Sequence, residues 1–214
     1  MRLPRAALLL VLAGVSACGD DAARAAPAAP PEAFARAVAC VAGPRYFPAP
    51  LEHGGRYRTV LTLLREKRLC PLEAGVDEVY RFTLVPSVTP AIAMRLSRRG
   101  EVWTMISRRA AEQPKSRPRP EPQELWSTHQ RVLTAGEAES LRGALAAARF
   151  WSLPAKGAAA PGQDGTSWVM EGVRDGFYHA TERWEPARGE PAYHALGLFL
   201  LRLSGFSSPE LAAR

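Results

Sequence analysis

Apolar residues recur with a helical period in the first third of the chain. They occupy positions i, i+3, i+4 and i+7 counted from Tyr57, which predicts a helix with one apolar face over residues 57–69. Residues 32–42 predict a second, shorter helix. Between residues 19 and 31 there is no large apolar side chain and several prolines occur, so this segment is expected to be a flexible tether.

From residue 79 onward the pattern changes to short runs that are rich in β-branched and aromatic residues, which are typical of strands. Four such runs occupy residues 79–85, 91–96, 102–106 and 125–132. Residues 111–123 separate the last two runs. They are polar and rich in proline, so they are expected to form an exposed loop.

Two more helices are predicted in the C-terminal half because their ends carry capping signals. Thr134 and Glu137 match a capping box. A last helix is expected to begin near Pro191 and to end at Gly205. Two strands lie between these helices. The resulting order of elements predicts an α+β fold, with an antiparallel sheet of about six strands and helices packed on one face.

Residues 164–184 (DGTSWVMEGVRDGFYHATERW) hold an unusual density of charged and aromatic side chains around an expected turn. A two-residue turn at Asp175-Gly176 would leave both faces of the hairpin mixed. A three-residue loop at 174–176 separates apolar from polar side chains better and places Glu171 opposite His179. We predict this second register.

In the predicted register, three aromatic residues share the face toward the core: Trp168, Tyr178 and Trp184. That face is expected to pack on the two C-terminal helices, because these rings would otherwise lie in water. Glu171 and His179 would then form a solvated pair on the outer face, where a cross-strand ion pair contributes little stability.

A carboxylate beside an imidazole is also the arrangement of a general base, because the carboxylate fixes the tautomer of the ring. Glu171 and His179 are therefore the candidate functional pair. The supporting candidates are Asp164, Trp168, Tyr178 and Arg183. The sequence lacks a strained Gly-x-Ser-x-Gly turn and the HExxH, GxGxxG and Walker motifs. We therefore favour a structural pair over a catalytic one, and expect neither a metal nor a cofactor.

The first residues of the chain are typical of a bacterial signal peptide. Arg2 and Arg5 precede an apolar run that is too short to span a bilayer. The following Val-Ser-Ala-Cys resembles the lipobox of bacterial lipoproteins, which implies cleavage before Cys18 and acylation of that residue. Gly19 after the cysteine implies the outer membrane, with the domain facing the periplasm.

The expected organisation is a signal peptide at 1–17, a tether at 18–31, one globular domain at 32–208 and a short tail at 209–214. Of 214 residues, 47% are apolar, which is enough for one core. The net charge is +7, but the basic residues are scattered and the chain is expected to be exported. We therefore expect the membrane, through the lipid anchor, and an envelope protein as partners, and no nucleic acid.

Export makes the remaining cysteines informative, because disulfides persist in oxidising compartments. Cys40 and Cys70 are predicted to form a disulfide, which would contribute about 3–4 kcal/mol in the chain-entropy model. Two buried free thiols are the alternative.

Residues 79–205 resemble a family of uncharacterised bacterial proteins, many of them exported or lipid-anchored. The matching residues are Phe150-Trp151, Leu153-Pro154, Asp164-Gly165, Trp168, Glu171, Tyr178-His179, Arg183-Trp184 and Pro186. The resemblance implies no activity, since none is assigned to the family.

Three functions remain open from the sequence. The leading hypothesis is a non-enzymatic binding or interaction module on a lipid tether. The second is a hydrolase-like enzyme built around Glu171 and His179. The third is an inhibitor or immunity-type protein that presents the proline-rich loop at 111–123 to a partner.

Overall fold

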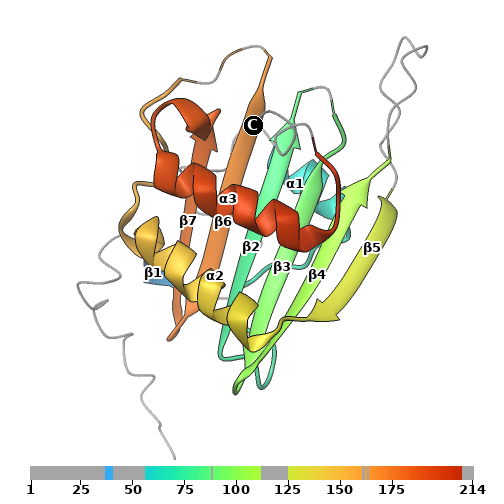
Figure 1. Ribbon diagram of the computed structural model, residues 1–214, viewed down its shortest axis with the longest axis vertical. Coiled ribbons are helices and arrows are strands. Elements are labelled where there is room, and N and C mark those ends of the chain that lie inside the picture. Colours follow the sequence, from blue (N-terminus) through green and yellow to red (C-terminus); the bar gives the residue numbers. More distant parts are fainter. Residues whose placement is uncertain are drawn as a thin grey trace, which may run out of the picture.

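Seven antiparallel strands form one sheet in the part of the chain that the structure describes (Figure 1). This computed structural model describes residues 37–40, 56–87, 89–111, 125–160, 162 and 164–208. The strands are β1 (Val38–Ala39), β2 (Glu78–Pro86), β3 (Ile92–Arg99), β4 (Val102–Ala110), β5 (Leu125–Val132), β6 (Thr166–Arg174) and β7 (Phe177–Trp184). Their spatial order is β1-β7-β6-β2-β3-β4-β5. The predicted α+β class with an antiparallel sheet is confirmed, with seven strands where about six were expected.

The helices pack on both faces of the sheet. They are α1 (Arg56–Leu63), α2 (Ala135–Ala147) and α3 (Pro191–Ser204), with the short 3-10 helices η3 (Phe150–Ser152) and η4 (Pro186–Arg188). α2 and α3 lie side by side over one face, where Phe82, Trp168 and Leu200 belong to one core cluster (Figure 1). The structure adds that α1 covers the second face, where Leu61 packs with Val169.

Because both faces are covered, the central strands have no solvent-facing side. All residues of β2 and of β6 except the last are buried. Alternate side chains along one strand therefore enter two different cores. Strands of this kind do not show the alternation of apolar and polar residues that a half-exposed strand shows.

The predicted signals at the ends of α2 and α3 are confirmed. Thr134 and Glu137 form a capping box, in which the backbone N–H of Glu137 donates a hydrogen bond of 3.2 Å to Oγ1 of Thr134. Hydrogen bonds from Arg131 and from the Thr134 N–H lower the pKa of Glu137 to about 2. Pro191 begins α3, and Gly205 ends it in the left-handed conformation, with φ of 75°.

The predicted disulfide is also confirmed. Cys40, directly after β1, is bonded to Cys70 in the segment between α1 and β2, and their Cα atoms lie 5.5 Å apart. This bond holds β1 against the segment that follows α1. The structure contains no helix, within the described residues, that is long and apolar enough to cross a bilayer.

The predicted helix over residues 32–42 is wrong where the structure describes it, at 37–40. Val38 pairs with Tyr178 of β7, and the N–H of Cys40 donates to the carbonyl of Gly176 at 2.8 Å. Pairing satisfies backbone groups at the edge of the sheet that a helix there would leave open. The helix predicted over 57–69 is confirmed as α1 but ends at Leu63.

Several predictions concern residues outside the described ranges. They include Cys18, the signal peptide at 1–17, the tether at 18–31, the tail at 209–214 and nearly all of the proline-rich loop at 111–123. These remain predictions.

Candidate functional site

The β6–β7 hairpin has a two-residue turn, so the predicted three-residue loop is wrong. Arg174 pairs with Phe177, and both turn residues have positive φ, 53° at Asp175 and 77° at Gly176. Two successive positive φ values define the type I′ turn that Asp-Gly sequences favour. The prediction failed because it assumed one buried face, whereas here both faces are buried.

This register separates the predicted pair. Glu171 lies opposite Ala180, and His179 lies opposite Gly172, so the two side chains point to opposite faces of the sheet. His179 is buried beside Phe150 and Trp151, at centroid distances of 5.1 and 6.1 Å. Glu171 and His179 therefore do not form a catalytic pair.

The expected grouping of aromatic residues is also wrong. Trp168 lies on the face of the sheet that α2 and α3 cover, as predicted. Tyr178 lies in the cluster on the α1 face instead. Trp184 pairs with Ser167, whose side chain points to the opposite face from that of its neighbour Trp168. Trp184 therefore shares the face of Tyr178.

Glu171 belongs to a buried charge cluster on the α1 face. Its carboxylate oxygens accept hydrogen bonds from Nε and Nη2 of Arg81, at 2.6 and 2.7 Å. The hydroxyl of Tyr178 donates a further bond at 3.0 Å. The side chains of Arg81 and Glu171 have no exposed surface. This is a bidentate arginine–carboxylate pair, the strongest geometry for such an interaction.

Glu66, which follows α1, extends this cluster. Its carboxylate is bonded to Arg108 and lies 3.7 Å from Nη1 of Arg81 and 3.8 Å from Nε of Arg95. Nη1 of Arg81 also donates to the carbonyl of Lys67 at 2.6 Å. The cluster therefore links the segment after α1 to the middle of the sheet.

Burial and the neighbouring charges shift the pKa values of this cluster. Burial raises the pKa of Glu171, and the bonds from Arg81 and Tyr178 oppose that rise. Burial alone would lower the pKa of Arg81, but Glu171 and Glu66 outweigh it and the net shift is upward. Neither member of the central pair reaches solvent, so Arg81 and Glu171 cannot contact a ligand from outside.

The remaining predicted residues do not gather at one site. Asp164 is exposed in the bend before β6. Arg183 lies at the other end of β7 from His179, bonded to Glu190 and with its guanidinium 5.4 Å from the ring centroid of Tyr193. The contacts of Arg183 therefore connect β7 to the start of α3.

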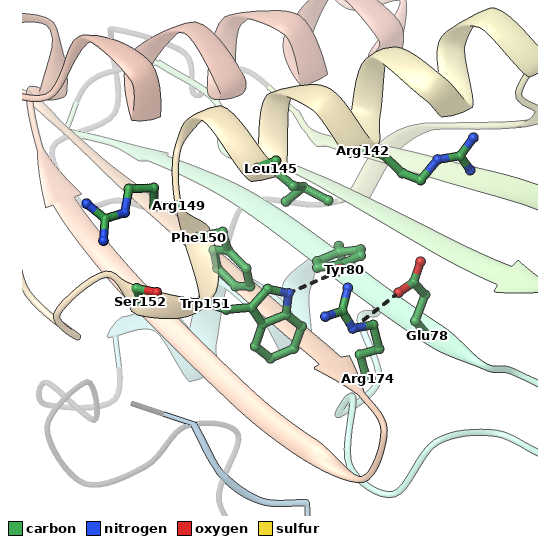
Figure 2. A pocket seen from close by; sticks show the side chains of 10 residues that line it. Glu78, Tyr80, Arg142, Leu145, Arg149, Phe150, Trp151, Ser152 and Arg174 are labelled. Atoms are coloured by element: carbon green, nitrogen blue, oxygen red, sulfur yellow. Dashed lines mark hydrogen bonds and ion pairs between the residues drawn. The ribbon is translucent and has the colours of Figure 1, made fainter. Parts of the chain in front are cut away.

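A pocket of about 360 Å³ that no sequence pattern predicts lies where α2 ends (Figure 2). We call it the Trp151 pocket. Its lining residues are Glu78, Tyr80, Arg142, Leu145, Ala146, Arg149, Phe150, Trp151, Ser152 and Arg174. Its volume falls at the lower end of the range for small-molecule sites.

The floor of the Trp151 pocket is aromatic. Tyr80, Phe150 and Trp151 contact one another edge to face, with centroids 5.2 to 6.1 Å apart. The indole N–H of Trp151 donates to the hydroxyl of Tyr80 at 3.3 Å, as Figure 2 shows. These contacts hold the rings in a fixed arrangement.

Three arginines and one glutamate surround this floor. The guanidinium of Arg174 lies over the ring of Trp151, 5.4 Å from its centroid, with Nε 4.0 Å from Glu78. Arg98 also bonds to Glu78, at 3.1 Å. The rim therefore carries more positive than negative charge.

A sequence pattern could not reveal the residues that line the pocket, because they come from β2, α2, η3 and β6.

A second pocket of about 380 Å³ adjoins the first and shares Arg149 and Ser152 with it. Its other lining residues are Ala147, Ala148, Leu153, Glu190, Pro191, Ala192 and Tyr193. Arg149 and Ser152 thus lie where the two pockets meet. No group of three or more His, Cys, Asp or Glu side chains that could hold a metal ion occurs within the described ranges.

Comparison of the chain with protein-family models, with curated proteins and with solved structures finds no match. The function must therefore be inferred from the geometry of the chain's own residues.

Proposed function

We propose that this protein is a lipid-anchored protein of the bacterial envelope whose domain binds a small ligand in the Trp151 pocket without catalysing a reaction. The observation that carries the proposal is the pocket itself: a fixed aromatic floor, an excess of arginine on the rim and a volume of about 360 Å³. Apolar walls with a few polar groups are typical of ligand sites.

Two observations favour a location in the cell envelope. The lipobox-like Val-Ser-Ala-Cys ending at Cys18 favours an anchor on the outer membrane. The disulfide between Cys40 and Cys70 favours an oxidising compartment such as the periplasm.

Binding is favoured over hydrolysis by the chemistry of the pocket lining. Its one carboxylate, Glu78, is held by Arg98 and lies beside Arg174. The hydrolase hypothesis relied on Glu171 and His179, which lie on opposite faces of the sheet. The interaction hypothesis that relied on the proline-rich loop concerns residues outside the described ranges.

Filling the Trp151 pocket is expected to abolish ligand binding. Ala146 lines the pocket from the exposed side of α2, so Ala146→Phe would occupy its space without altering the core. A ligand-observed NMR screen of small aromatic compounds, charged and uncharged, should give hits with wild type that Ala146→Phe loses.

Ala147→Phe is the matched control, because Ala147 is equally exposed on α2 but lines only the neighbouring pocket. It should retain the hits. Compounds that bind Ala146→Phe as well as wild type, or no hits at all, would contradict the proposed function.

Lipidation of Cys18 is tested by metabolic labelling with a fatty-acid probe in the bacterial host. The wild-type chain should take the label and Cys18→Ala should lose it, since the thiol and the new amino group of Cys18 would be the acceptors. Label that persists in Cys18→Ala would refute the anchor.

A further inference from the structure

Arg149 occupies a backbone position that ordinarily favours glycine. It follows the last residues of α2 with φ of 50° and ψ of 39°, the left-handed conformation that commonly ends a helix. For a residue with a Cβ atom this conformation is unfavourable, whereas glycine adopts it readily. The chain therefore keeps an arginine at the mouth of the Trp151 pocket at a cost to stability.

Its side chain also differs from those of the other two arginines. Arg142 is paired with Glu139 at 2.6 Å, and Arg174 lies beside Glu78 and Asp175. Arg149 is exposed and makes no side-chain hydrogen bond or ion pair with any residue that the structure describes. Of the three arginines that line the pocket, Arg149 therefore has the guanidinium with the fewest interactions within the protein.

Figure 2 shows Arg149 and Ser152 on one side of the aromatic floor and Arg142 on the other. Between them in this view lie Trp151 and Leu145, and Ala146 also lines the pocket. A cationic end beside an apolar surface matches a ligand that has an anionic group at one end and an apolar ring at the other. A guanidinium binds a carboxylate, sulfonate or phosphate through two parallel hydrogen bonds.

We propose that the Trp151 pocket takes an anionic ring compound, with Arg149 binding the carboxylate, sulfonate or phosphate group and Trp151, Leu145 and Ala146 contacting the ring. This inference rests on the proposed function and specifies its ligand class. The hydroxyl of Ser152 is available to the same anionic group, because it lines the pocket beside Arg149.

The competing explanation is that Arg149 only compensates the partial negative charge at the end of α2. Arg202 in the last turn of α3 offers the matched control, since it is an exposed cation at a helix end that does not line the pocket. Arg149→Gly separates the two explanations further. Glycine fits the left-handed backbone, so this variant removes the guanidinium without destabilising the helix end.

The experiment is calorimetric titration of the full chain in phosphatidylcholine nanodiscs, with empty nanodiscs as the blank. The probes are 2-naphthalenesulfonate and the uncharged 2-naphthalenesulfonamide, which share one ring system. Wild type should bind the sulfonate at least tenfold more tightly than the sulfonamide. Arg149→Ala and Arg149→Gly should remove that preference, Arg149→Lys should keep part of it, and Arg202→Ala should keep all of it.

The outcomes distinguish this inference from the proposed function. Equal binding of both probes that Ala146→Phe abolishes would overturn the anionic ligand class and leave the pocket as a binding site. A preference for the sulfonate that survives in Arg149→Ala would also overturn the inference. If neither probe binds, or if Ala146→Phe binds both as wild type does, the pocket is not a ligand site and both proposals fail. Arg149→Gly should melt at the wild-type temperature or above, and a lower melting temperature would assign Arg149 a structural role.

Discussion

Replacing Glu171 with glutamine is expected to lower the free energy of unfolding by about 3–5 kcal/mol, because it leaves a buried guanidinium without its counter-charge. The side chains of Arg81 and Glu171 have no exposed surface, and two bonds of 2.6 and 2.7 Å join them. The amide of glutamine can accept one of these bonds but carries no charge. The hydroxyl of Tyr178 would also lose a charged acceptor.

A urea titration of wild type and variant measures this loss. Glu139→Gln is the matched control, because Glu139 and Arg142 form an ion pair of similar length that is exposed, with 75% and 51% of their side chains accessible. That substitution should cost about 1 kcal/mol or less. If Glu171→Gln costs no more than Glu139→Gln, the charges of Glu171 and Arg81 are in contact with solvent and are not buried.

A double substitution tests whether the cost comes from the unpaired charge. Arg81→Met combined with Glu171→Leu removes both charges and keeps apolar side chains in the core. Replacing a whole buried pair in this way is often neutral or stabilising. The double variant should therefore be more stable than Glu171→Gln alone, and a double variant of lower stability would show that the pair itself stabilises the fold.

Local signals in the sequence were sufficient for most of the elements. The capping box at Thr134 and Glu137 involves only neighbouring residues, so it could be recognised without knowing the fold. The same holds for the glycine that ends α3 and for the β-rich runs that became β2, β3, β4 and β5. Cys40 and Cys70 could be paired because no other partner remained once Cys18 was assigned to lipid.

The hairpin register depended on information that lies outside the hairpin. We chose a register by separating apolar from polar side chains, which is valid only if one face of the sheet is exposed. α1 and the segment after it cover the second face and supply Glu66 to the charges there. Glu171 does lie on the face opposite Trp168, as predicted, but that face is buried, and Tyr178 rather than His179 lies beside Glu171. The Asp175-Gly176 turn was the better local signal.

The Trp151 pocket could not be predicted from the sequence for a related reason. Glu78 and Arg174 are neighbours because β2 and β6 pair, although they are far apart in the chain. Arg149 and Trp151 reach the same place because α2 ends above that pair of strands. Only the tertiary structure brings these residues together, and no spacing in the chain marks them as a set.

Trp168→Ala is expected to cost about 3–5 kcal/mol, because it leaves a cavity between the sheet and α3. The side chain of Trp168 is 2% exposed and contacts the ring of Phe82 edge to face, with the centroids 5.5 Å apart. The backbone of α3 lies directly on the indole: a Cβ atom at Gly197 would come within 2.2 Å of it. A helix in such close contact, fixed along its length by other core residues, cannot move to fill the space.

Trp126→Ala removes the same atoms from the surface and is the control for this prediction. Trp126 lies on the edge strand β5 with 64% of its area exposed, and the guanidinium of Arg109 lies over its ring, 5.3 Å from the centroid. Its loss should cost about 1 kcal/mol or less. The difference between the two variants in one urea titration series measures what burial of the indole contributes. Equal costs would mean that α3 closes over the vacated space, and that the close contact between Gly197 and Trp168 does not fix the position of the helix.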